Sequence, residues 1–202
     1  YSRSQELQSD ELGVRYLTLF SFSSENWQRP ISEIDDLMGL LRWYLRSETA
    51  ELHKNGVRLR VIGDRTRLPK DIVGLIESAE KTMAENSGLL LVLALSYGGR
   101  QDIVNAAKSL AENVAAGHLD ASQIDDTLFQ SQLATNGVPD PDLLIRTSGE
   151  QRISNFLIWQ LAYTEFVFSD VLWPDFDHIH FENAVEEFRR RDRRYGATIE
   201  SR

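Results

Sequence analysis

Short apolar runs rich in β-branched and aromatic residues alternate along this chain with longer segments of helical periodicity. Each run is short enough to be one buried strand. The runs lie at 14–22, 57–62, 89–95, 143–145 and 166–168. Strands that alternate with crossover helices form a mostly parallel sheet covered on both faces. The sequence therefore predicts an α/β fold with a central, mostly parallel sheet flanked by helices.

The segments between the predicted strands place apolar residues three or four apart, as amphipathic helices require. Helices are predicted over 34–52, 72–83, 103–114, 154–163 and 181–191. No repeat, low-complexity stretch or linker interrupts the 202 residues. A chain of this length can bury one sizeable core, so a single domain over residues 1–202 is expected.

The net charge and the absence of cysteine exclude some classes of function. The chain has 22 Lys and Arg against 31 Asp and Glu, a net charge of −9, which argues against broad nucleic-acid binding because counterion release needs a basic face. It has no cysteine, which excludes disulfides, thiolate metal sites and a cysteine nucleophile. No secretory signal and no apolar run of about 18 residues is visible, and a cytoplasmic protein is predicted.

Ligands of parallel sheets collect outside the carboxyl ends of the strands. Arg146, Arg152 and Ser154 follow one predicted strand and precede a predicted helix. Two guanidinium forks and the free N–H groups of a helix start could surround a diphosphate there. The alternative is that the arginines are solvated loop charges and that Ser154 only caps its helix.

Two other places are open to two interpretations. Asn26, Trp27 and Arg29 follow the first strand and form either a polar rim with an aromatic wall beside a phosphate or a capped loop in which the indole fills a gap. Glu165 directly precedes an apolar strand, where a divalent cation or an arginine could meet its carboxylate. A solvated surface glutamate is the commoner case.

Five segments, taken in order, carry a family resemblance. They read FSSENWQRP (22–30), RLRVIGD (58–64), SYGGRQDI (96–103), DLLIRTSGEQRISNFLIWQLAYTEFVF (142–168) and DVLWPDFD (170–177). They resemble the successive signature blocks of the cis-prenyltransferases, the family of undecaprenyl diphosphate synthase. The resemblance runs through nearly the whole chain. It implies a parallel-sheet catalytic domain with a deep hydrophobic tunnel, acting as a homodimer.

The resemblance also implies an activity. Such enzymes condense isopentenyl diphosphate onto an allylic diphosphate with Mg²⁺ and leave a cis double bond in the product. Farnesyl diphosphate is the expected starter. The expected product is a long polyprenyl diphosphate, such as undecaprenyl diphosphate, that serves as a lipid carrier in cell-wall synthesis. A product so apolar implies transient contact of a peripheral enzyme with the membrane surface.

Site roles follow from the resemblance, residue by residue. Arg146, Arg152 and Ser154 would hold the diphosphate of isopentenyl diphosphate, and Glu165 would help to position Mg²⁺. Asn26 is implicated in the proton-loss step, Trp27 borders both substrates, and Arg29 contacts a diphosphate. Arg194 and Gly196 match an Arg-x-Gly element that reaches across the dimer.

The tunnel must bury the growing chain, at roughly 0.8 kcal/mol for each methylene. The candidate wall residues are apolar, and each is otherwise ordinary core: Leu37, Val57, Leu89, Leu91 and Leu93. Ser21, a small residue, leaves space at that wall.

One family motif is not found. The family begins with a strand ending in Asp-Gly-Asn-Gly-Arg, whose aspartate and glycine-rich loop bind the allylic diphosphate and Mg²⁺. The 202 residues do not contain it, and the opening YSRSQELQSDELGV resembles the helix that follows it. The first strand and its loop are therefore expected to be missing, and the chain as it stands is predicted not to catalyse the condensation.

Two alternatives remain open. A non-catalytic partner subunit of a heteromeric cis-prenyltransferase would lack the aspartate naturally, but the retained arginines, Ser154, Glu165 and the Arg-x-Gly element argue against it. A generic phosphate-binding domain rests on architecture alone and explains none of the order of the segments.

Overall fold

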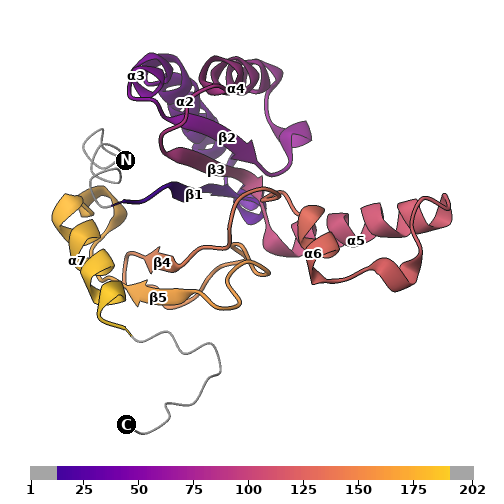
Figure 1. The fold of residues 1–202 in the computed structure, drawn as a ribbon. Helices are drawn as coiled ribbons and strands as arrows, with labels where there is room; N and C mark the ends of the chain where they lie inside the picture. Colours follow the sequence, from indigo (N-terminus) through magenta and orange to yellow (C-terminus); the bar gives the residue numbers. More distant parts are fainter. Residues whose placement is uncertain (1–12, 192–202) are drawn as a thin grey trace, which may run out of the picture. The chain divides into compact units, whose positions relative to one another are not determined.

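A computed structural model describes residues 13–191, which divide into two compact units (Figure 1). Residues 13–139 form the amino-terminal unit and residues 140–191 the carboxyl-terminal unit. No helix within the described residues is long and apolar enough to cross a membrane.

The amino-terminal unit is a three-stranded parallel sheet with strand order β1-β3-β2. Helices α2, α3 and α4 pack over one face of it (Figure 1). Its elements are β1 (Tyr16–Ser23), η1 (Ser24–Gln28), α2 (Ile31–Ser47), α3 (Thr49–Lys54), β2 (Arg58–Ile62), η2 (Arg65–Arg67), α4 (Lys70–Met83), β3 (Leu90–Tyr97), α5 (Gly99–Ala115), η3 (Ala121–Gln123) and α6 (Asp126–Ser131).

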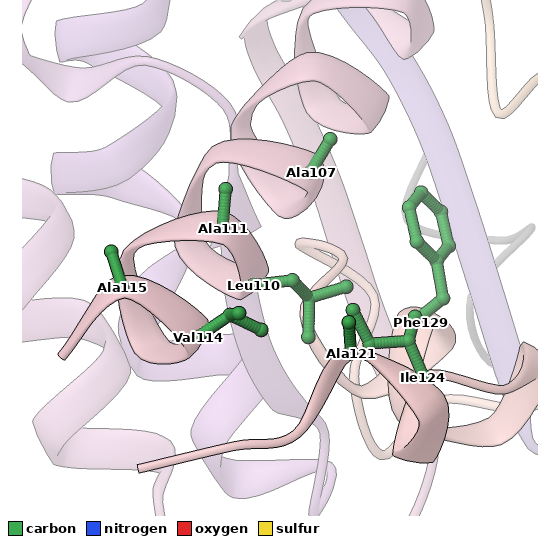
Figure 2. A pocket seen from close by; sticks show the side chains of 8 residues that line it. All are labelled: Ala107, Leu110, Ala111, Val114, Ala115, Ala121, Ile124 and Phe129. Carbon is green, nitrogen blue, oxygen red and sulfur yellow. The ribbon is translucent and has the colours of Figure 1, made fainter. Parts of the chain in front are cut away.

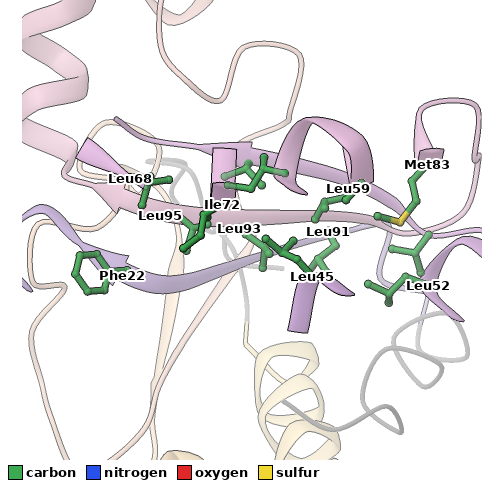
Figure 3. Close-up of a cluster of buried hydrophobic side chains, with 14 of the residues drawn as sticks. Phe22, Leu45, Leu52, Leu59, Leu68, Ile72, Met83, Leu91, Leu93 and Leu95 are labelled. Carbon is green, nitrogen blue, oxygen red and sulfur yellow. The ribbon is translucent and has the colours of Figure 1, made fainter. Parts of the chain in front are cut away.

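The central strand β3 is buried at every residue, which explains its continuous apolar sequence. Side chains alternate between the two faces of a strand. Leu91 and Leu93 of β3 face the helical layer, where Ile72 and Met83 of α4 meet them (Figure 3). The register sets Leu59 of β2 beside Leu91, so the same core extends across the sheet.

The carboxyl-terminal unit contains β4 (Leu143–Arg146), β5 (Glu165–Phe168), η4 (Trp173–Asp175) and α7 (His178–Arg189). The two strands pair in parallel. Asp177 begins α7 with a capping box, in which its carboxylate accepts from the backbone N–H of His180 at 3.2 Å.

The predicted fold class is confirmed, since every strand pair among the described residues is parallel and helices flank the larger sheet. The predicted helix over 34–52 is divided into α2 and α3, which meet at Glu48. The predicted helix over 154–163 is wrong. Ser154, Asn155 and Leu157 have positive φ values of 48°, 62° and 41°, which a right-handed helix does not tolerate, and the segment consists of turns.

Candidate functional site

The connection that follows β4 is fixed to the segment that follows β5. Ser169 donates its backbone N–H to the carbonyl of Arg146 at 2.8 Å. Ser148 donates to the carbonyl of Val171 at 2.8 Å, and Gly149 to that of Ser169 at 3.0 Å. These bonds hold the loop that carries the predicted arginines at the carboxyl end of a parallel strand pair, which is where such sheets bind ligands.

This connection contains unusual backbone. Ser148 and Gly149 both have a φ of 67°, and Ser154 has 48°. A β-carbon added at Gly149 would lie 3.4 Å from Oδ1 of Asp170, and the left-handed backbone there favours glycine in any case. Non-glycine residues persist in this conformation where their surroundings hold them, and they concentrate at ligand-binding segments.

Arg146 carries the clearest sign of a ligand. Its side chain is partly buried, and its Nε is buried without a hydrogen-bond partner among residues 13–191. A buried donor without a partner is costly, and most such donors in proteins are satisfied. A phosphate oxygen would supply the missing acceptor and the opposite charge together.

Arg152 and Ser154 lie further along the same connection. Arg152 is exposed and forms an ion pair with Glu150. A diphosphate would therefore compete with Glu150 for this guanidinium. The N-terminal amides of a helix, which were expected to assist, are not available here because the helix is absent.

Glu165 does not lie at the same strand end as Arg146. The register pairs Leu143 with Glu165 and Arg146 with Phe168. Glu165 thus begins its strand at the amino end of the pair, three residues or about 10 Å along the strands from Arg146.

The partner of Glu165 is an arginine. Nη1 of Arg191 lies 2.9 Å from Oε2 of Glu165 and donates to the carbonyl of Phe166 at 2.9 Å. Nη2 of Arg191 lies 2.5 Å from Oε1 of Glu187. The hydrogen bonds to Glu165 and then to Glu187 raise the pKa of Arg191 above its usual range.

Glu165 alone supplies only one carboxylate to a metal ion. Among the described residues no group of three or more His, Asp or Glu side chains could hold a metal ion. Mg²⁺ in phosphate sites takes only one or two protein carboxylates and completes its coordination with substrate oxygens and water. One half-buried carboxylate fits that pattern, provided that it exchanges Arg191 for the ion.

A second group of predicted residues lies in the amino-terminal unit, where η1 follows β1. Ser23 and Asn26 form a capping box: the N–H of Ser23 donates to Oδ1 of Asn26 at 2.8 Å, and the N–H of Asn26 donates to Oγ of Ser23 at 3.3 Å. Arg29 is exposed and pairs with Glu33 at 2.6 Å. The short helix therefore holds Asn26 at the carboxyl end of β1.

Trp27 is held on several sides. Its Nε1 donates to Oγ of Ser96 at 2.9 Å, and its ring and that of Phe22 pack edge to face with the centroids 4.9 Å apart. The guanidinium carbon of Arg67 lies 5.0 Å from the centroid of the indole. Phe22 lies on β1, Ser96 on β3 and Arg67 on η2, and sequence reasoning gave a role to none of them.

The candidate tunnel residues divide into three kinds. Val57, Leu89, Leu91 and Leu93 are at most 4% exposed and belong to the packed core. Leu37 is half-buried against that core, and Ser21 is exposed on β1. Arg194 and Gly196 lie outside the described residues.

The described residues also form an apolar pocket of about 470 Å³ between α5, η3 and α6 (Figure 2). Only alanine, leucine, valine, isoleucine and phenylalanine side chains line it. It contains no group that could bind a diphosphate or move a proton.

Comparison with known proteins identifies the family. A family model described as "Putative undecaprenyl diphosphate synthase" matches residues 5–196. Isoprenyl transferase 2 of Bradyrhizobium diazoefficiens is 54% identical over 191 residues, which cover 95% of this chain and 76% of that protein. The isoprenyl transferase of Bacillus subtilis is 53% identical over 188 residues, which cover 93% of this chain and 72% of that protein.

Solved structures agree. Lavandulyl diphosphate synthase from Lavandula x intermedia, in complex with dimethylallyl diphosphate, matches with a TM-score of 0.92 and 39% identity over 96% of this chain and 84% of that one. A probable undecaprenyl diphosphate synthase from Campylobacter jejuni matches with a TM-score of 0.83 and 35% identity over 96% of this chain and 93% of that one. The chain belongs to the undecaprenyl diphosphate synthase family of isoprenyl transferases.

Proposed function

We propose that this isoprenyl transferase condenses isopentenyl diphosphate with an allylic diphosphate, starting from farnesyl diphosphate, and leaves a cis double bond at each cycle. The buried, unpartnered Nε of Arg146 is the observation that carries the proposal, because it calls for an anionic acceptor at the carboxyl end of β4. Arg152 and Ser154 would bind the same diphosphate, with Arg152 exchanging Glu150 for a phosphate oxygen.

The reaction balances without an external oxidant or reductant. The bond between the first carbon of the allylic substrate and its diphosphate breaks, and the terminal double bond of isopentenyl diphosphate forms the new carbon–carbon bond. A proton then leaves the second carbon of the isopentenyl unit. Positive charge beside the departing diphosphate would stabilise the negative charge that grows on it.

Asn26, Trp27 and Arg29 would border the reacting carbons, with Asn26 near the departing proton. Their common position on η1 and at its end supports this assignment, since all three follow one strand at its carboxyl end. Arg29 would have to leave Glu33 to meet a phosphate.

Glu165 would hold Mg²⁺ together with phosphate oxygens of the substrate. Bound there, the ion would act as a Lewis acid that neutralises charge on those phosphate oxygens. The carboxylate would first have to release Arg191, which now neutralises it.

The allylic end of the reaction requires more than the residues of this chain supply. We propose that the two units work as one catalytic domain and that it uses the Asp-Gly-Asn-Gly-Arg motif, which the 202 residues do not contain. The 202 residues alone should therefore be inactive.

The growing chain would occupy a tunnel beside the core, with Leu37 and Ser21 nearest to open space and Val57, Leu89, Leu91 and Leu93 behind them. The product would be long, as a cell-wall lipid carrier requires. A homodimer in which Arg194 and Gly196 reach the partner's diphosphate, and brief contact with a membrane surface to release the product, complete the proposal.

The test is direct. The whole gene product is incubated with farnesyl diphosphate, labelled isopentenyl diphosphate and Mg²⁺, and the extracted lipids are separated by length. Extended polyprenyl products that are lost in Arg146→Ala support the proposal. If no extended product forms alone but activity of a second prenyltransferase rises on mixing, the chain is instead a non-catalytic partner subunit.

A further inference from the structure

We infer that Arg67 is a positioning residue of this enzyme: its guanidinium covers the indole of Trp27 and holds that side chain at the carboxyl edge of the sheet. The inference rests on the proposed function, in which Trp27 borders the substrates. No residue of η2 is otherwise assigned a role.

The contacts that place η2 start at Gly63, which directly follows β2. A β-carbon at Gly63 would lie 2.0 Å from the carbonyl oxygen of Leu95, and its φ is 113°. Only glycine lets the chain leave β2 so close to β3. Asp64 then donates its backbone N–H to the carbonyl of Ser96 at 3.1 Å, which fixes the start of η2 against the end of β3.

The short helix η2 is itself well defined. Oδ1 of Asp64 accepts from the N–H of Thr66 at 2.9 Å and from its hydroxyl at 2.6 Å. Arg65 turns inward to Glu80, at 2.7 Å, and to the carbonyl of Val61, at 2.9 Å. Arg67 is exposed, and its guanidinium lies over the Trp27 ring.

Ser96 joins this helix to Trp27. Its Oγ accepts the indole N–H at 2.9 Å, while its own backbone has a φ of 51° and its side chain is 3% exposed. The indole is thus hydrogen-bonded at one edge and packed against Phe22 at 4.9 Å. The guanidinium of Arg67, 5.0 Å from the centroid, covers a face of the ring.

The charges around Arg67 favour this role. Within residues 13–191 Arg67 forms no ion pair, whereas Arg65 pairs with Glu80 and Arg29 with Glu33. A guanidinium that no carboxylate competes for is attracted to the ring face of tryptophan. The loop that carries Asn26 and Arg29 is therefore held by contacts of Trp27 with β1, β3 and η2.

The experiment uses the whole gene product and compares Arg67→Met, which keeps the length of the side chain without its charge, with Arg67→Lys, which keeps a cation. Arg58→Met is the matched control, because Arg58 is an exposed arginine at the opposite, amino end of β2. Hydrogen exchange of the Trp27 indole proton, assigned with Trp27→Phe, is measured by NMR, together with kcat, KM and the melting temperature.

We expect Arg67→Met to speed exchange of the indole proton about two- to five-fold, as loss of an exposed cation–π contact predicts. Its kcat/KM should fall by a similar factor with an unchanged melting temperature, while Arg67→Lys and Arg58→Met stay near the wild-type values. Wild-type exchange in Arg67→Met, or a wild-type kcat/KM despite faster exchange, would overturn the inference. If the wild-type protein makes no product at all, the proposed function has failed, and the exchange rates alone decide whether Arg67 holds Trp27.

Discussion

Glu165 and Arg191 form an ion pair of 2.9 Å that joins the first residue of β5 to the second residue after α7. Arg191 also binds the carbonyl of Phe166 and the carboxylate of Glu187. One guanidinium therefore ties the helix to the strand and neutralises the carboxylate that is the candidate metal ligand.

Replacing Arg191 by methionine should loosen the end of α7. Both side chains of the pair are about one-third exposed, at 32% and 30%, so solvent screens much of the attraction. We expect a loss of about 1 kcal/mol in the free energy of unfolding, measured in urea. Arg190→Met is the control, since Arg190 is 77% exposed and pairs only with Glu186 of its own helix among the described ion pairs. Equal stability of both variants would contradict the claim that Arg191 ties α7 to β5.

Glu165→Gln tests whether Glu165 is a ligand of Mg²⁺. A neutral amide binds Mg²⁺ less strongly than a carboxylate does, so the Mg²⁺ concentration for half-maximal activity should rise about tenfold or more. Glu187→Gln also removes a partner of Arg191 but leaves Glu165 charged, and it should keep the wild-type Mg²⁺ dependence. An unchanged Mg²⁺ dependence in Glu165→Gln would show that Glu165 does not hold the ion.

Asp177 should stabilise the fold at neutral pH and lose this effect at low pH. Its carboxylate accepts from the backbone N–H of His180 and interacts with the His180 side chain, which lowers the pKa of Asp177 below its usual value. A carboxyl group with a lower pKa in the folded state stabilises the fold above the unfolded pKa, about 3.9, and this contribution is lost as the pH falls through the folded value. Melting temperatures of wild type and Asp177→Ala should therefore differ most at neutral pH and converge below about pH 4. A constant difference would contradict this origin of the stability.

Product length should respond to bulk at Leu37, which is half-buried on α2. Leu37→Trp should shorten the polyprenyl products if the side chain borders the tunnel. Leu40→Trp adds the same bulk at a 61% exposed position of the same helix and should leave the lengths unchanged. The same product lengths in both variants would remove Leu37 from the tunnel wall.

A substitution of Leu91 tests whether the four buried tunnel candidates are ordinary core. Leu91 is fully buried, and leucine-to-alanine changes at such positions cost about 2–5 kcal/mol. Denaturant unfolding of Leu91→Ala should show a loss in this range. A loss well below it would indicate that Leu91 borders open space.

The strands were predictable because a strand that is buried on both faces consists almost entirely of apolar residues. In β3 every residue from Leu90 to Tyr97 is buried, and the run is correspondingly apolar. Parallel pairing in the larger sheet followed from the helical segments between its strands, since such crossovers connect parallel neighbours. The grouping of Arg146, Arg152 and Ser154 followed in turn, because residues that follow one strand share one connection.

The failure over 154–163 has a physical cause. Leu157 and Leu161 are buried and lie four positions apart, as residues on one face of a helix do. The left-handed backbone at Ser154 and Asn155 depends on tertiary contacts, which no local propensity records. Contacts between residues distant in sequence could not be predicted for the same reason. Trp27 bonds to Ser96, 69 positions away, and Glu165 bonds to Arg191, 26 positions away.

The central claim is that Arg146 binds the diphosphate of isopentenyl diphosphate, and calorimetric titration measures this most directly. Isopentenyl diphosphate is titrated into the wild-type protein, Arg146→Met and the surface control Arg190→Met, with folding of each verified by circular dichroism. Loss of a charge-assisted hydrogen bond worth about 1.5–3 kcal/mol should weaken binding by Arg146→Met about 10- to 100-fold, and Arg190→Met should bind like the wild type. Equal affinity of Arg146→Met and wild type would contradict the account.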